Sequence, residues 1–200
     1  METNHSDASV ELAVVELLSL PKNGKTVGPD HRITLYSMLA FLNPSSPVSN
    51  SIIQTTLPLL AKETHDAATS VLASAMLPHL VCLLRDDEAS PPHTATLIAK
   101  EMNNSKPVIR RAFCSLAGGA LWENGDLSTK GSLAFAKVVL PSFENNLKTI
   151  SSNPLNSSGG PLEGYIATTV LLGPFCRSGK FGMFRRPNSE QSLGHFLNSL

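Results

Sequence analysis

The chain is poor in aromatic residues and carries no net charge, and each of these features excludes a class of protein. Aromatic side chains make up 6% of its 200 residues, so the core must be built from aliphatic side chains, as in packed helices. Lys and Arg together number 16, as do Asp and Glu, so no overall field attracts the chain to nucleic acid or anionic lipid. Any such contact must be local.

Cysteine, a secretory signal and long apolar runs are also scarce or missing. The 3 cysteines (Cys82, Cys114 and Cys176) are widely spaced and odd in number, which is typical of a reducing compartment rather than a disulfide framework. Residues 1–10 are polar and acidic, unlike the start of a secretory signal. No uninterrupted apolar run approaches the roughly 18 residues that a membrane span needs. We therefore expect a cytoplasmic protein with no membrane contact.

No set of residues has the arrangement that catalysis or cofactor binding requires. Hydrolysis needs a nucleophile, a base and an orienting carboxylate, and phosphate binding needs a glycine-rich turn that opens a helix. Gly118 and Gly119 instead lie inside a helical run, which favours close packing or a kink. His79 and Cys82 share a helix face like half of a zinc site, but the second half is missing. We expect a partly buried histidine and a core thiol, and no enzyme, cofactor, metal or small-molecule substrate.

Apolar residues recur at spacings of three and four, and Pro, Gly, Asn, Ser or Asp separate the periodic segments, as in a chain of helices. The alternation of a half-buried strand never lasts beyond a few residues. Pro58, Pro78 and Pro141 fall inside three segments, where we expect kinks or an early end. The pattern predicts an all-α fold with eight helices, near residues 7–20, 30–42, 49–60, 64–84, 91–102, 106–122, 128–150 and 161–172.

The predicted helices form pairs with a period near 40 residues. Their first helices start near residues 7, 49, 91 and 128, and HEAT and armadillo arrays repeat helix pairs at about 40 to 47 residues. Four-helix bundles also alternate helices with short loops, but the period favours the array. We predict a HEAT/armadillo-type α-solenoid of about four antiparallel pairs, at residues 7–42, 49–84, 91–122 and 128–172. The basic, aperiodic residues 173–200 are expected to be a disordered tail.

The segment "KPVIRRAFCSLAGG" at residues 106–119 resembles the second helix of a HEAT repeat. In that family a proline starts the helix, small residues permit close helix approach, and an arginine bonds between neighbouring repeats. The resemblance therefore implies structural roles, rather than ligand contacts, for Pro107, Arg110, Ala112 and Gly118.

A longer stretch, with "HRITLYSMLAFL", "TLPLLAKETHDAATSVLASAMLPHL" and "KPVIRRAFCSLAGGALW", resembles the N-terminal HEAT region of the translational activator of general amino-acid control. The resemblance covers about residues 30–172. It implies a non-catalytic scaffold that binds ribosomes and an ATP-binding partner protein and signals amino-acid starvation to the initiation factor 2 alpha kinase. Members are much longer, so we expect a fragment that does not activate the kinase alone. The alternative is a generic HEAT or armadillo adaptor in transport or complex assembly.

Basic side chains in the later half are the best candidates for contact with a macromolecule. They lie on consecutive predicted helices or in their turns, and a stacked array would place turns of neighbouring pairs along one edge. Such an edge could contact ribosomal RNA phosphate or an acidic protein, although mixed charges are ordinary on any helical surface. The run at residues 85–88 favours a solvated turn. The candidates are Lys100, Lys106, Arg111, Lys130 and Lys137.

Overall fold

The computed structural model describes residues 27–86, 92–124 and 129–152, and these fold into helices joined by short connections. The elements are α2 (Pro29–Met38), the 3-10 helix η1 (Leu39–Phe41), α3 (Ser46–Leu60), α4 (Asp66–Arg85), α5 (Pro92–Glu101), α6 (Pro107–Glu123) and α7 (Lys130–Ser152). The three ranges contain no strand, so the all-α prediction is confirmed for them. The helices predicted at residues 7–20 and 161–172, and the tail at 173–200, lie outside the described residues.

Prolines and capping groups set where the helices begin. Pro47 and Pro107 occupy the first two positions of α3 and α6, where the missing N–H has no partner to lose. α3 starts at Ser46, three residues before the predicted start, because its first turn accepts Pro47. At α4, the His65 side chain accepts a hydrogen bond from the Ala68 N–H at 3.5 Å and so caps the start of the helix.

Pro58, Pro78 and Pro141 lie inside α3, α4 and α7, and each helix continues past its proline. Of the kink or early end expected at Pro58, the early end does not occur, and α3 ends at Leu60, where the sequence placed its end. All three rings are on exposed faces of their helices. A carbonyl that loses its helical N–H donor there can face water, which makes the interruption tolerable.

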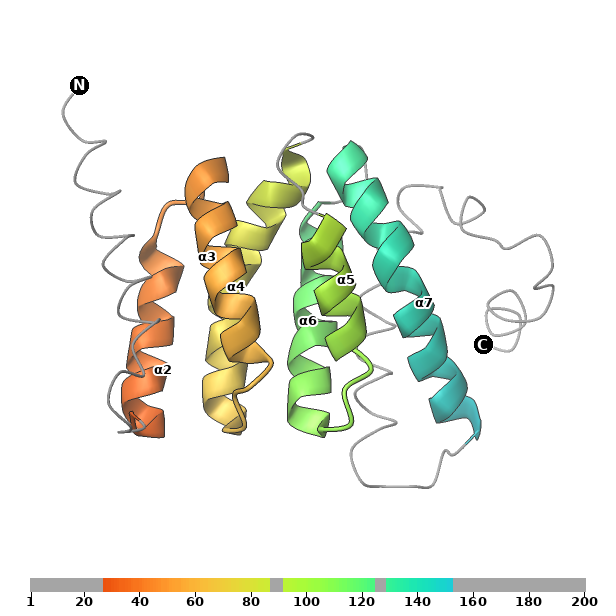
Figure 1. The fold of residues 1–200 in the computed structure, drawn as a ribbon, viewed down its shortest axis with the longest axis horizontal. Helices are drawn as coiled ribbons and strands as arrows, with labels where there is room; N and C mark the ends of the chain where they lie inside the picture. Colours follow the sequence, from red (N-terminus) through yellow and green to blue (C-terminus); the bar gives the residue numbers. More distant parts are fainter. Residues whose placement is uncertain (1–26, 87–91, 125–128, 153–200) are drawn as a thin grey trace.

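The helices stand side by side in a row (Figure 1). α3 and α4 form one antiparallel hairpin over residues 46–85, and α5 and α6 form the next over residues 92–123. The turns within both hairpins lie at the lower edge in this view. α2 packs on α4 at one end of the row, and α7 packs on α5, α6 and α4 at the other. α4 is central, because it contacts α2, α3, α6 and α7.

One continuous apolar core runs through the described helices, filled by side chains such as Leu39, Ile52, Met76, Phe113 and Phe135. The 20-residue α4 has the length and composition of a membrane-crossing helix, although polar residues interrupt its apolar sequence. However, 61% of its apolar 18-residue window is buried inside the fold. A helix that touches four neighbours must be apolar around most of its circumference, which explains this composition.

Hydrogen bonds fix α7 at its start and near its middle. At its start, the Thr129 hydroxyl donates to the Leu84 carbonyl oxygen at the end of α4, at 2.6 Å. Farther along, the Ser142 hydroxyl donates to the Ala99 carbonyl oxygen of α5 at 2.9 Å. α7 is therefore held against both hairpins, and its first turn is tied to the end of the row's central helix.

Candidate interaction surfaces

Glu63 ties α2 to the turn between α3 and α4. Its carboxylate accepts hydrogen bonds from Arg32 Nε at 2.7 Å, Arg32 Nη2 at 3.0 Å and the Tyr36 hydroxyl at 3.1 Å. The main-chain N–H groups of Thr64 and His65 donate to its Oε1 atom, both at 3.0 Å. The Glu63 side chain is 4% exposed, so this bidentate ion pair is shielded from water. A carboxylate with this many donors is a structural tie rather than a catalytic acid.

The same contacts shift two pKa values. Burial raises the pKa of the Glu63 carboxyl, but the hydrogen bonds from Arg32 and the His65 N–H outweigh burial and hold the pKa below its ordinary value. Burial, together with the neighbouring Glu63 charge, raises the pKa of Tyr36 to about 12. At neutral pH the tie therefore joins an ionised carboxylate to a protonated phenol.

His79 is fully buried where α4 meets α3 and η1. Its Nε2 atom lies 3.3 Å from the Leu39 carbonyl oxygen, and Nδ1 lies 3.2 Å from the Ser49 hydroxyl. A neutral ring protonated at Nε2 satisfies both partners, since Nε2–H donates to the carbonyl and Nδ1 accepts from the hydroxyl. Burial lowers the pKa of the ring. The sequence predicted only partial burial for this histidine.

The cysteines do not assemble a site with His79 in the part of the chain that the structure describes. Cys82, which was expected to be a core thiol, is instead half-buried and lines a groove, whereas Cys114 is buried. Cys176 lies outside the described residues. Residues 27–86, 92–124 and 129–152 contain no group of three His, Cys, Asp or Glu side chains placed to hold a metal ion.

The structure brings three of the five predicted basic residues to one edge. Lys100 and Lys106 flank the α5–α6 turn, and Arg111 follows in the first part of α6, near the lower edge in Figure 1. Lys130 begins α7 at the opposite edge, and Lys137 lies farther along that helix. All five side chains are exposed. They therefore do not form the single basic edge that the sequence suggested.

Two residues that sequence reasoning left out belong to the lower edge. The exposed Lys62 lies in the α3–α4 turn, beside the α5–α6 turn in the row (Figure 1). Asp66 at the start of α4 forms an ion pair with Arg111 of α6 at 3.6 Å, which links the two hairpins. The turn edge is defined here as Lys62, Lys100, Lys106 and Arg111. Lys62 could have been found by asking which residues occupy the same turn in consecutive helix pairs.

The implied repeat positions Pro107 and Arg110 organise the α5–α6 turn. Pro107 is in the first turn of α6. Arg110 Nη1 donates to the main-chain oxygens of Asn104 at 2.8 Å and Ser105 at 3.5 Å, so its guanidinium holds the turn against the start of the helix. These bonds are consistent with a structural role for Arg110, made through its own turn.

Ala112 and Gly118 are buried on the side of α6 that faces the core. At the neighbouring Gly119, an added Cβ would lie 3.1 Å from Leu77 Cδ1 of α4. The missing side chain at Gly119 therefore allows α6 to approach α4 closely.

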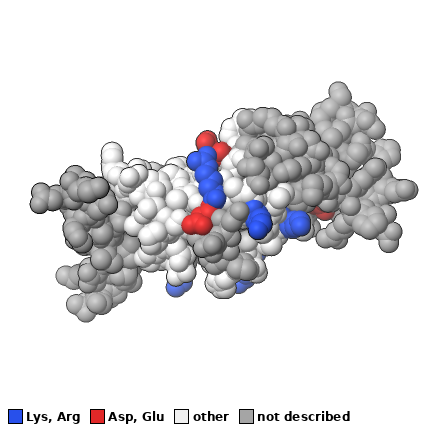
Figure 2. Space-filling model, turned by 90° about the horizontal axis from the view of Figure 1, so that it is seen from above, with Lys and Arg blue, Asp and Glu red and all other residues white. Residues whose placement is uncertain are grey.

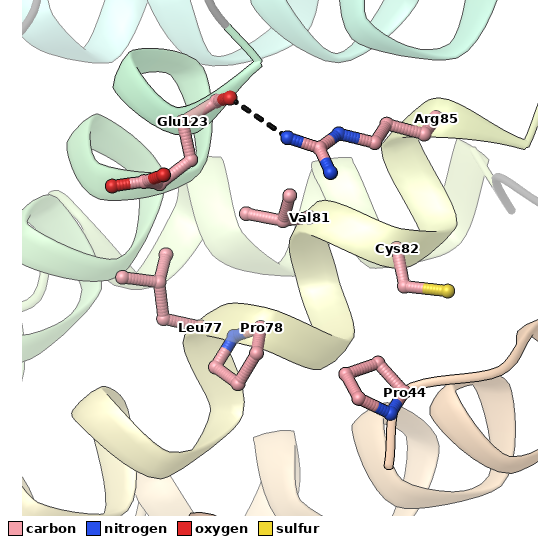
Figure 3. Close-up of a pocket in the computed structure, with 7 residues that line it drawn as sticks. All are labelled: Pro44, Leu77, Pro78, Val81, Cys82, Arg85 and Glu123. Carbon is pink, nitrogen blue, oxygen red and sulfur yellow. Dashed lines mark hydrogen bonds between the residues drawn. The ribbon is translucent and has the colours of Figure 1, made fainter.

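A groove of about 470 Å³ lies along the outer side of α4 (Figure 3). Arg85, which the sequence placed in a solvated turn, ends α4 at one end of the groove. Its Nη2 atom donates to the Glu123 main-chain oxygen of α6 at 3.1 Å. We call this feature the α4 groove; it is lined by Pro44, Leu77, Pro78, Val81, Cys82, Arg85 and Glu123.

The surface beside the groove is unusually free of charge. Residues 33–61, which cover most of α2, η1 and α3, contain no Asp, Glu, Lys or Arg. Figure 2 shows the described surface at this end as largely uncharged, with a basic group at its lower margin, while most charged side chains gather toward the middle of the molecule. Phe41 is 87% exposed and Trp122 is 44% exposed, and each is close in sequence to a groove residue. Two exposed aromatic side chains thus accompany an apolar groove.

Comparison with known proteins identifies the family of the chain. No curated protein and no solved structure matches it. The family model described as General control nonderepressible 1 (Gcn1) N-terminal matches residues 29–194. The matched range runs past residue 172, where the resemblance was expected to end, and takes in most of residues 173–200. The chain therefore belongs to the Gcn1 N-terminal family, which associates it with Gcn1 translation control.

Proposed function

We propose that the chain is a non-catalytic interaction module in translation control, built as a HEAT-type solenoid. The observation that carries the proposal is the family match over residues 29–194. The spacing of the hairpins supports the repeat architecture. Their first helices begin at Ser46 and Pro92 and their second helices at Asp66 and Pro107, and both intervals lie in the range of about 40 to 47 residues typical of HEAT and armadillo pairs.

The row of helices supports a role in presenting a surface. In a solenoid each helix pair contacts its neighbours, so turns of successive pairs line an edge that an extended partner can follow. Here the α3–α4 and α5–α6 turns share the lower edge in Figure 1, and the Asp66–Arg111 ion pair joins the hairpins there. We propose a fold of about four such pairs across residues 7–172, working in the cytoplasm.

The turn edge is the proposed surface for the ribosome. Lys62, Lys100 and Lys106 are exposed, and lysines at such positions can neutralise RNA phosphates while remaining hydrated. Contacts of this kind weaken steeply as salt rises, because binding releases counterions. By resemblance to the activator family, the further partners are an ATP-binding protein of the same pathway and, through the longer assembly, the initiation factor 2 alpha kinase.

Cosedimentation of the chain with ribosomes at increasing salt tests this function. The double variant Lys100→Glu, Lys106→Glu should lower the slope of log affinity against log salt by about 1 for each lysine. The matched control is Lys130→Glu, Lys137→Glu, which changes the same charge away from the turn edge. Equal losses in both variants would contradict the assignment to the turn edge. No retention of the unaltered chain at low salt would instead favour a generic adaptor in transport or complex assembly.

A further inference from the structure

We infer that the α4 groove receives an apolar segment of a partner protein that carries a carboxylate at the end facing Arg85. This inference rests on the proposed role as an interaction module, and it assigns a second surface, separate from the turn edge. The groove lies by the end of α4, whereas the turn edge lies by its start. A partner in the groove could therefore bind while the turn edge is occupied.

The floor of the groove is apolar. Leu77, Pro78 and Val81 come from successive turns of α4, and Pro44 faces them from the α2–α3 connection (Figure 3). A volume of about 470 Å³ is within the range of about 300 to 1,000 Å³ that ligand pockets show. Covering such a floor with apolar side chains removes both surfaces from water, which stabilises a complex.

Arg85 supplies charge complementarity at one end. A guanidinium has five N–H donors, and the bond from Nη2 to the Glu123 main-chain oxygen uses one of them. That bond holds the planar group in place, so less side-chain freedom is lost when it binds a carboxylate through two parallel hydrogen bonds. In Figure 3 the Glu123 carboxylate points away from the guanidinium. The Arg85 end of the groove therefore favours an acidic group.

The surroundings of the groove favour a protein segment over RNA. A nucleic acid needs several cations in line with its phosphates, whereas Arg85 is the only Lys or Arg among the groove residues. Exposed Phe41 and Trp122, close in sequence to Pro44 and Glu123, are of the residue types enriched at protein interfaces. The uncharged run 33–61 adds no steering field, so selection for an acidic segment depends on Arg85.

Site-specific photo-crosslinking in the full chain tests the inference. Pro44 is exposed in a connection between helices and lines the groove, so p-benzoylphenylalanine at this position places the probe beside the partner. The matched control carries the same probe at Gln54, which is exposed on α3 and does not line the groove. Mass spectrometry of the product then identifies the crosslinked segment.

The expected product is specific to the Pro44 probe and contains an apolar segment with an Asp or Glu side chain. Arg85→Glu should lower the yield of this product by about fivefold or more, and Arg85→Lys should lower it less. When the chain carries Arg85→Glu, replacing the acidic residue of the partner segment with Lys should restore the yield. Circular dichroism confirms that the Arg85 variants remain folded. Any of four results would overturn the inference. The crosslinks could match those of the Gln54 control, or persist in Arg85→Glu. They could also join another copy of this chain or its own residues, or reach RNA.

The ribosome assay separates this inference from the proposed function. Arg85→Glu leaves Lys62, Lys100 and Lys106 unchanged, so ribosome cosedimentation should stay within about twofold of the unaltered chain. Retained ribosome binding with no groove product would reject the groove alone. If the unaltered chain does not bind ribosomes but gives a groove crosslink that depends on the charge at Arg85, the ribosome assignment alone is rejected.

Discussion

Replacing Gly131 with alanine is expected to disturb the contact between α7 and the end of α4. An alanine Cβ at this position would lie 2.8 Å from the Leu84 carbonyl oxygen and 3.4 Å from the Asp86 carbonyl oxygen. Both are main-chain atoms that cannot rotate away as the end of a side chain can. α7 must therefore move outward, which strains the bond of 2.6 Å from the Thr129 hydroxyl to the Leu84 carbonyl oxygen.

Two opposing effects set the magnitude. Alanine favours the helix over glycine by about 1 kcal/mol. Overpacking costs about 1 to 3 kcal/mol, and weakening the Thr129 hydrogen bond adds up to about 1 kcal/mol. The net expectation is a loss of up to about 3 kcal/mol in the free energy of unfolding, and about 1.5 kcal/mol at the middle of these ranges. For a chain of this size each kcal/mol lowers the melting temperature by about 2 to 4 °C.

Thermal unfolding followed by circular dichroism measures this loss, and Gly119→Ala is the matched control. Its new Cβ would meet the methyl groups of Leu77 at 3.1 and 3.2 Å, and these belong to a side chain that can rotate. The control lies in the interior of α6, where the gain in helix propensity offsets the crowding at Leu77, so its stability should change by less than about 1 kcal/mol. A Gly131→Ala chain as stable as the unaltered chain, or as the Gly119→Ala chain, would refute the close backbone contact.

Three further predictions follow from the buried polar groups. The free energy of unfolding should fall as pH drops below 6.5, because His79 takes up a proton more readily in the unfolded chain. Urea titrations should show that the free energy of unfolding depends less on pH in His79→Gln, but not in the exposed control His31→Gln. The free energy of unfolding should also fall by up to about 3 kcal/mol as pH rises from 10 toward 12, because Tyr36 ionises at lower pH in the unfolded chain than in the folded one. Unfolding curves of Tyr36→Phe should not show this loss. Glu63→Gln should lower the free energy of unfolding by about 1 to 3 kcal/mol at pH 7. The difference from the unaltered chain should shrink below pH 4.5, where Glu63 in the unfolded chain is protonated. A difference that does not depend on pH would contradict the ion-pair account.

The helices were predictable because their signals are local. The spacing of apolar residues located six described helices, and Pro107 marked the start of α6 to within one residue. The sequence left open whether Pro58 kinks α3 or ends it early, because a sequence does not show which face of a helix its proline occupies. The Pro58 ring is exposed in the structure, and the helix continues past this residue.

The surfaces were harder to predict because they join residues far apart in sequence. Arg32 and Glu63 are 31 positions apart, and no local pattern pairs them. The α4 groove likewise gathers Pro44, Arg85 and Glu123 from three elements. Lys130 was within reach, however. In an antiparallel row, turns within pairs lie on one edge and connections between pairs lie on the other, so a lysine that follows α6 belongs opposite Lys106.

The Glu63 tie limits how the chain can be shortened from its N-terminal side. A version that begins after Arg32 would keep the carboxylate beneath Tyr36 and the main-chain amides but remove the guanidinium that balances its charge. The acid would then have to take up a proton, or water would have to enter beside α4, and either change loosens the first hairpin. The smallest stable unit around α3 and α4 therefore includes the start of α2.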